Sequence, residues 1–293
     1  MFGTRSVTAD LFKILMLWAL LGISGCAWLD TWARQKIYRP TPTDSMAVVD
    51  LSAGEEHFFL PVPQTGEPQR IALWWLPHAT QNAPTLLYLH GTFRNLAQNL
   101  PKINALREAG FAVLAVDYRG WGQSSPMVPS EQSILADARI AWAELARREP
   151  RAGQRVIYGH SMGSGVAVAL ASELAGQADY GALILESAFT SFAGVAGSAG
   201  FLASVLSGFS NERFASIDKI AQVHAPLLMI HGSHDRTVPM QLGQQLFEAA
   251  NQPKQWLTIE GGQHSDLQRV GQAPYQAALA AFKARYLSQP EQR

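Results

Sequence analysis

The sequence contains only one cysteine, Cys26, among its 293 residues, so no disulfide can form within a single chain. Charge is also scarce, because only 16% of the residues are Asp, Glu, Lys or Arg. The 23 basic and 23 acidic residues give a formal net charge of zero. Since the chain has no charge run or basic stripe, we expect no nucleic-acid partner.

A long hydrophobic run is missing as well. The apolar stretch near the amino terminus, residues 14–21, follows Arg5 and Lys13 and leads into residues 22–25, Gly-Ile-Ser-Gly. A membrane-spanning helix needs about 20 apolar residues. A secretory signal has a positive start, an apolar core of about 7–15 residues and a small-residue end. The pattern therefore predicts a signal peptide over residues 1–25.

The end of this segment, Ile23-Ser24-Gly25-Cys26, resembles a bacterial lipobox. The resemblance implies cleavage before Cys26, diacylation of its thiol and usually acylation of the new amino terminus. Two or three acyl chains hold a protein on a membrane, whereas one chain binds only marginally. An uncleaved anchor and a plain signal with an incidental cysteine are the alternatives. The position of the sole cysteine favours the lipoprotein.

The residue after the cysteine, Ala27, is not the aspartate associated with retention in the inner membrane. We therefore expect a protein of the cell envelope, lipid-anchored through Cys26 in the outer membrane and facing the periplasm. Residues 26–50, with Pro40 and Pro42, are expected to form a stalk.

Residues 51–293 alternate strand and helix patterns, which is typical of one α/β domain. Short apolar runs predict strands at Glu55–Leu60, Arg70–Leu76, Thr85–Leu89, Phe111–Val116, Arg155–Tyr158, Ala182–Leu185, Leu227–Ile230 and Trp256–Ile259. Three-to-four spacing of apolar residues and end signals predict helices at Leu96–Ala109, Ser130–Glu149 and Val166–Leu174. Turn residues between the first two strands favour a hairpin. The expected fold is a mostly parallel central sheet with helices on both faces, and with functional loops at the carboxyl ends of the strands.

The segment 159–163, Gly-His-Ser-Met-Gly, fits the G-x-S-x-G pattern of a nucleophile elbow. It lies between a predicted strand and a predicted helix, as that motif requires. Glycines let the chain make the sharp turn and let its neighbours approach closely. The glycines also fail the G-x-G-x-x-G spacing of a dinucleotide site, and no phosphate-binding Gly-Lys-Ser/Thr follows. The pattern predicts Ser161 as a catalytic nucleophile.

A serine needs a positioned base, usually a histidine held by a carboxylate. In this motif's fold the order along the chain is Ser, then Asp or Glu, then His. His264 lies in the loop after the last predicted strand, and Asp235 lies in the loop after the preceding strand. We therefore predict catalytic roles for Ser161, Asp235 and His264, with Glu186 as the alternative acid.

Two other features of the sequence bear on the site. His231 and His234 flank a short loop segment, but a third ligand at recognisable spacing is missing, so we expect no metal and no cofactor.

Backbone N–H groups after a strand and after the nucleophile form the oxyanion hole in this architecture. These roles fall on Thr92 and Met162, with Phe93 as the alternative to Thr92.

Together these segments resemble the Bem46/ABHD13-like branch of the α/β hydrolases. The matching segments run in order across about residues 55–285, at positions 90–92, 117–124, 159–163, 186–191, 231–239 and 261–264. The resemblance implies an α/β-hydrolase fold, and the family's triad and oxyanion roles fall on the residues already named. A lipobox is not a general trait of the family. The stretch of about residues 190–222 leaves room for only a small cap, and residues 193–207 are expected either to line an acyl pocket or to form a core helix.

We expect a serine hydrolase that cleaves carboxylic ester or thioester bonds in a small-molecule or acyl substrate. The superfamily also contains peptidases, so a peptidase on the same triad is an alternative. A catalytically idle envelope binding module is the alternative from another class. The complete set of Ser161, Asp235 and His264 argues against it.

Overall fold

The computed structural model describes residues 28–42, 54–63, 66–92, 94–177, 179–199 and 212–287. The predicted signal, Cys26 and residues 200–211 of the predicted cap lie outside the described residues. Within the described ranges, no helix is both long and apolar enough to cross a membrane.

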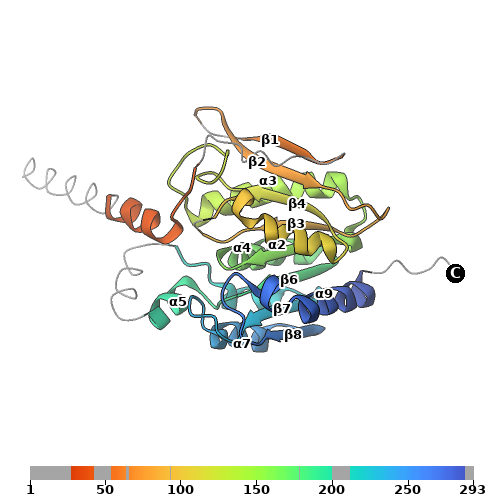
Figure 1. Ribbon diagram of the computed structural model, residues 1–293. Helices are drawn as coiled ribbons and strands as arrows, with labels where there is room; N and C mark the ends of the chain where they lie inside the picture. Colours follow the sequence, from red (N-terminus) through yellow and green to blue (C-terminus); the bar gives the residue numbers. More distant parts are fainter. Residues whose placement is uncertain are drawn as a thin grey trace, which may run out of the picture.

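One sheet runs through the centre of the molecule, with the strand order β1-β2-β4-β3-β5-β6-β7-β8 (Figure 1). The strands are β1 Glu56–Val62, β2 Gln69–Leu76, β3 Thr85–Leu89, β4 Ala112–Asp117, β5 Arg155–His160, β6 Ala182–Glu186, β7 Leu227–Gly232 and β8 Lys254–Ile259. β2 pairs antiparallel with β1 and β4, and the remaining pairs are parallel. The predicted hairpin and the mostly parallel sheet are both confirmed.

Helices cover both faces of this sheet (Figure 1). Their bounds are α2 Leu96–Glu108, α3 Glu131–Arg148, α4 Met162–Leu174, α5 Phe192–Ala199, α7 Met240–Ala249, α8 Leu267–Val270 and α9 Gln272–Tyr286. Apolar residues of α3, α4 and α7 share one hydrophobic cluster with one face of the sheet, and those of α2, α8 and α9 share a second cluster with the other face. The layers are those of an α/β-hydrolase fold.

The two clusters follow from the alternation of side chains along each strand. In β3, Leu87 and Leu89 belong to the first cluster, and Leu86 and Tyr88 belong to the second. All four side chains are fully buried. A strand covered on both faces is apolar at every position, which explains why β3 appears in the sequence as a continuous apolar run.

Helix α3 begins at a capping box in which Ser130 and Ser133 each accept a hydrogen bond from the other's backbone N–H. Its buried side is made by apolar residues at three-to-four spacing: Ile134, Leu135, Ala138, Ala141, Trp142 and Leu145. Burying a side chain of the size of Leu145 stabilises the fold by about 1.5–3 kcal/mol. Two arginines in the last turn suit the negative end of the helix dipole.

Part of the predicted stalk is helical and packs against the domain. Residues 28–38 form a helix, and its last residue, Tyr38, is fully buried. The Tyr38 ring contacts Trp121, Phe192 and Phe214, and its hydroxyl donates a hydrogen bond to Glu212. Tyr38 therefore joins the amino-terminal helix to the residues on both sides of segment 200–211.

Candidate active site

Ser161 lies on the sharp turn between β5 and α4, where the sequence pattern places it. Its backbone has φ 55° and ψ −124°, a left-handed conformation that is unusual for a residue with a side chain. The Ser161 N–H donates to the main-chain oxygen of Glu186 at 3.0 Å, which ties the turn to the end of β6. A Cβ on Gly163 would lie 2.0 Å from the Leu89 carbonyl oxygen, so the first turn of α4 accepts only glycine there.

Hydrogen bonds connect the three predicted catalytic residues in one chain. His264 Nε2 lies 2.8 Å from Ser161 Oγ, and His264 Nδ1 lies 2.8 Å from Asp235 Oδ2. Asp235 follows β7 and His264 follows β8, so the three side chains come from loops after three parallel strands. The carboxyl ends of such strands meet at the same edge of a sheet, which is why residues far apart in the sequence converge.

The Asp235 carboxylate is held by four groups. Oδ1 accepts hydrogen bonds from the N–H groups of Thr237 at 2.9 Å and Val238 at 2.8 Å. Oδ2 faces His264, and His231 Nε2 lies 3.4 Å away. Burial raises the pKa of this carboxyl, but the hydrogen bonds from His231, His264 and Val238 outweigh it and hold the pKa well below its ordinary value. Asp235 therefore remains ionised opposite the histidine.

His231 and His234 are not members of the hydrogen-bonded chain Ser161–His264–Asp235, although His231 lies beside the Asp235 carboxylate. His231 donates from Nε2 to the Val238 carbonyl at 3.0 Å and stacks on Trp256. The His234 side chain is exposed, and its N–H donates to the Gly262 carbonyl at 2.9 Å. Among the described residues, no three His, Cys, Asp or Glu side chains converge in a way that could hold a metal ion.

The loop after β3 lies against the nucleophile. A Cβ on Gly91 would be 3.0 Å from Ser161 Cβ and 3.3 Å from the His160 carbonyl oxygen. Thr92 and Ser161 line the same small cavity, and Met162 is the first residue of α4. Neither the Thr92 N–H nor the Met162 N–H has an acceptor among the residues that the structure describes. Both predicted oxyanion donors thus flank Ser161.

Two larger hollows open beside His264. One has a volume of about 720 Å³ and is bordered by residues of α2, α8 and the loop that carries the histidine, including Glu108 and Arg269, and by Arg94 of the loop before α2. The other, of about 510 Å³, is bordered by residues 233–237 together with Gln263 and His264. The smaller hollow has a mainly polar border, and the larger one is bordered by polar and apolar surface in about equal parts.

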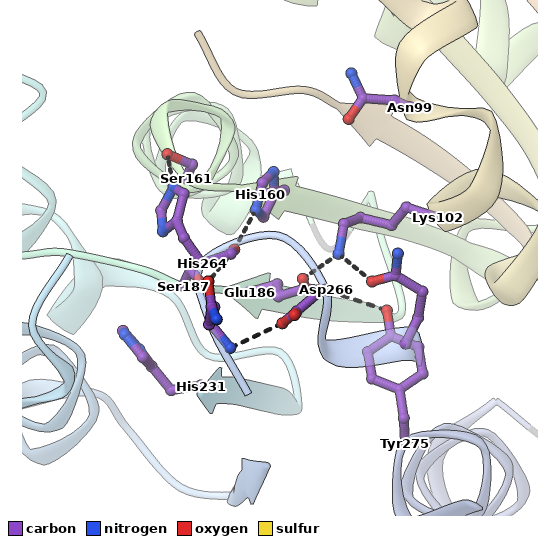
Figure 2. A network of polar contacts seen from close by, with 12 residues as sticks. Asn99, Lys102, His160, Ser161, Glu186, Ser187, His231, His264, Asp266 and Tyr275 are labelled. Atoms are coloured by element: carbon purple, nitrogen blue, oxygen red, sulfur yellow. Dashed lines mark hydrogen bonds and ion pairs between the residues drawn. The ribbon is translucent and has the colours of Figure 1, made fainter. Parts of the chain in front are cut away.

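Sequence reasoning missed the contacts behind the three predicted catalytic residues. Glu186, the alternative acid, does not bond to His264; its carboxylate accepts hydrogen bonds from Lys102 and Tyr275 (Figure 2) and from Tyr158. Figure 2 also shows His160 and Ser187 beside the main chain of His264. The sequence signal for these contacts was the position of Glu186 and Ser187 at the carboxyl end of a strand, where residues face the site.

Known proteins resemble this chain in sequence and in fold. A family model described as serine aminopeptidase, S33, matches residues 80–213. The uncharacterized protein Rv2307c of Mycobacterium tuberculosis is 36% identical over 241 residues, which cover 80% of this chain and 82% of that protein. The alpha/beta hydrolase domain-containing protein 17B of Xenopus laevis is 32% identical over 226 residues, which cover 76% of this chain and 74% of that protein.

Among solved structures, the esterase Pf2001 of Pyrococcus furiosus is similar with a TM-score of 0.67 and covers 85% of this chain and 97% of that chain. Its sequence identity is only 18%, so this similarity speaks for the fold alone. The fold that the sequence motifs imply is confirmed. The two relatives above 30% identity establish descent as well as fold, and the chain belongs to the α/β-hydrolase family that includes the alpha/beta hydrolase domain-containing protein 17B.

Proposed function

We propose that the protein is a serine hydrolase that cleaves carboxylic ester or thioester bonds through an acyl-enzyme intermediate. One observation carries the proposal: Ser161, His264 and Asp235 form an unbroken chain of two hydrogen bonds of 2.8 Å each. Such a chain is the arrangement that activates a serine hydroxyl.

In the first half of the reaction, His264 Nε2 takes the proton from Ser161 Oγ as the oxygen attacks the substrate carbonyl carbon. The carbonyl oxygen becomes an oxyanion, which the N–H groups of Thr92 and Met162 stabilise. When this intermediate collapses, the bond to the leaving alcohol or thiol breaks. The imidazolium of His264 gives its proton to the leaving group, and the acyl group stays on Ser161.

In the second half, His264 takes a proton from a water molecule, whose oxygen attacks the acyl carbon. The same oxyanion site is used, and the proton then returns to Ser161 Oγ as the carboxylic acid leaves. Asp235 holds His264 in the tautomer that presents an unprotonated Nε2 to the serine, and it stabilises the imidazolium when that forms. The low pKa of Asp235 suits this role, because the carboxylate is charged throughout.

A peptidase acting through the same triad is the second candidate. The family model that matches residues 80–213 is described as a serine aminopeptidase, which is the specific observation in its favour. The chemistry differs only in the leaving group, since an amine needs protonation by His264 before it can depart.

Turnover of three substrate classes by the purified full-length protein tests both candidates. We expect hydrolysis of acyl esters or acyl thioesters, with kcat lost in Ser161→Ala. Hydrolysis of aminoacyl amides with esters and thioesters left intact would favour the peptidase. Turnover that survives unchanged in Ser161→Ala would exclude both.

We also propose that the protein is a lipoprotein of the outer membrane that faces the periplasm, anchored through acylated Cys26. The lipobox-like sequence before Cys26 supports this, and so do the exposed side chains of Trp28, Leu29 and Trp32 shortly after it. Tryptophan is enriched where proteins meet the membrane–water interface.

Within the superfamily we assign the chain to the Bem46/ABHD13-like branch on its sequence motifs.

A further inference from the structure

Two consecutive residues, Glu186 and Ser187, contact the strand or loop that carries each of the three proposed catalytic residues. The Glu186 carbonyl accepts the N–H of Ser161 at 3.0 Å. The Ser187 N–H donates to the carbonyl of Ile230, in the strand that leads to Asp235, at 3.0 Å. The Ser187 hydroxyl donates to the main-chain oxygen of His264 at 3.1 Å.

The side chain of Glu186 is buried and fixed by polar contacts. It has no exposed surface, and its carboxylate pairs with the Lys102 ammonium and accepts a hydrogen bond from the Tyr275 hydroxyl (Figure 2). The Tyr158 hydroxyl also donates to it. Burial raises the pKa of Glu186, but Lys102 and these hydrogen bonds outweigh it and hold the pKa below its ordinary value. Lys102 is itself buried and also donates to Gln268 at 2.8 Å.

His160 provides a second hold on the His264 main chain. His160 Nε2 lies 2.9 Å from the His264 carbonyl oxygen. Burial, followed by the nearby Lys102 ammonium, lowers the pKa of His160 to about 3, so the ring is neutral near neutral pH. A carbonyl oxygen can only accept, which places the single ring proton on Nε2. Consistently, the buried Nδ1 has no hydrogen-bond partner among the described residues.

His264 needs these contacts because its loop lies beyond the end of β8, where the hydrogen bonds between strands no longer fix the main chain. From the side of Asp235, the Ser233 and His234 N–H groups donate to the carbonyls of Ile259 and Gly262. His160 and Ser187 hold the loop from the side of the nucleophile. The imidazole is thereby fixed between the two residues that it must reach.

We propose that Ser187 and His160 are positioning residues that fix His264 through its main-chain carbonyl, and that the Lys102–Glu186 pair locks Ser187 in place. The inference rests on the proposed function of the triad. A buried ion pair adds little net stability compared with apolar residues of the same size, whereas it can specify one conformation. Ser187 has φ 51°, a strained value for serine that such a lock would maintain.

Variants of the two positioning residues give the primary test, in the full-length protein with the folded active-site concentration measured by titration. Ser187→Ala and His160→Leu each remove one hydrogen bond to the His264 carbonyl. We expect kcat to fall about 10- to 100-fold with KM unchanged, because a displaced base slows the chemical step without touching the bound substrate. His160→Gln, which keeps an N–H near the position of Nε2, should restore kcat to within a few-fold of wild type.

The two hydrogen bonds share one acceptor, so their losses should not be independent. Either single variant leaves the carbonyl held by the other residue, and the combined variant Ser187→Ala/His160→Leu releases it. We expect the double variant to lose more kcat than the product of the two single losses. Ser124→Ala is the matched control, since that buried hydroxyl also donates to a main-chain carbonyl, that of Asp117. It should lower stability but leave kcat unchanged.

The ion pair is tested by Lys102→Met and by Lys102→Met/Glu186→Gln. The single variant leaves the Glu186 carboxylate buried without its cation, and we expect kcat to fall at least about 10-fold. The double variant keeps an acceptor for both tyrosine hydroxyls without a buried charge. It should recover thermal stability and most of kcat.

Wild-type kcat in folded Ser187→Ala and His160→Leu would overturn the proposal, and so would a loss that appears only in KM. A kcat loss in His160→Gln as large as that in His160→Leu would overturn the role of the N–H donor. If wild-type protein neither turns over esters, thioesters or amides nor reacts at Ser161, the proposed function itself fails. Active wild-type protein with unaffected positioning variants refutes this inference alone.

Discussion

Ser161 and His264 are 103 positions apart in the sequence, and Oγ of the serine lies 2.8 Å from Nε2 of the histidine. The contact bridges the loops after β5 and β8, with β6 and β7 between these strands in the sheet. A hydroxyl that donates to an imidazole can lose its proton to it, which is the geometry that the proposed attack on a carbonyl carbon requires.

The triad residues should behave as one unit. We expect His264→Ala to lower ester kcat by several orders of magnitude, and the addition of Ser161→Ala to cost little more, because members of a triad are strongly non-additive. Asp235→Asn should cost about 10⁴-fold, the value known for the corresponding change in a well-studied protease, because an amide can hold the wrong imidazole tautomer. Steady-state kinetics on the folded variants measure these losses.

The control for this prediction is His234→Ala, since the His234 side chain is exposed and its contact with the loop of His264 is made by its backbone N–H. Its kcat/KM should stay within a few-fold of wild type. Inactivation by His234→Ala combined with an active His264→Ala would identify a different base and would call for a metal-dependence assay with a chelator.

The approach of the β3 loop to Ser161 predicts that Gly91→Ala damages the oxyanion site. The new methyl group would meet Ser161 Cβ at 3.0 Å and the His160 carbonyl at 3.3 Å, so the two segments must separate by a few tenths of an ångström, and we expect this to displace the Thr92 N–H. Loss of one oxyanion donor costs about 10²- to 10³-fold in kcat. Thr92→Ala keeps the N–H and should remain near wild type. Equal kcat values for Gly91→Ala and wild type would contradict the assignment.

Burial of His160 predicts a specific pH dependence of stability. The folded chain binds a proton on this ring only near pH 3, whereas the unfolded chain binds it near the ordinary pKa of about 6.5. Between these values the unfolded state holds more protons, so the free energy of unfolding falls as the pH decreases, by about 1.4 kcal/mol per pH unit. The contribution of the neutral ring is fully present above about pH 6.5.

Urea unfolding of wild type and His160→Gln at about pH 7 and about pH 5 measures this effect. The glutamine cannot titrate, so wild type should lose about 2 kcal/mol more than the variant between the two pH values. Parallel losses in the two proteins would show that His160 does not remain neutral in the fold.

The proposed lipid anchor predicts incorporation of labelled fatty acid when the full-length protein is made in a Gram-negative cell. The acyl chains make the protein fractionate with the outer membrane. Cys26→Ser removes the only thiol, so it should abolish the label and leave an unprocessed precursor. Equal incorporation in wild type and Cys26→Ser would rule out acylation at this cysteine.

Most of the sheet and the residues at its carboxyl edge could be predicted, because continuous apolar runs and the order Ser, Asp, His leave few alternatives. The start of α4 was misplaced. Its first turn contains Gly163 and Gly165, which are poor helix formers, and close packing on Leu89 and Phe214 overrides that preference.

The network behind His264 could not be predicted from sequence. Lys102, Glu186 and Tyr275 come from α2, β6 and α9, and only the packing of these elements brings their polar groups together. The position of Tyr38 could not be predicted for the same reason, because the aromatic residues that surround it, Trp121, Phe192 and Phe214, come from distant parts of the sequence.

Covalent labelling of the nucleophile tests the central claim most directly. A fluorophosphonate probe forms a stable bond only with an activated serine, so purified wild-type protein should be labelled, and mass spectrometry should locate the adduct on Ser161. Folded Ser161→Ala should not react, and His264→Ala should react far more slowly because its serine lacks the base. Labelling of Ser161→Ala at the wild-type rate, or an adduct on another residue, would contradict the account.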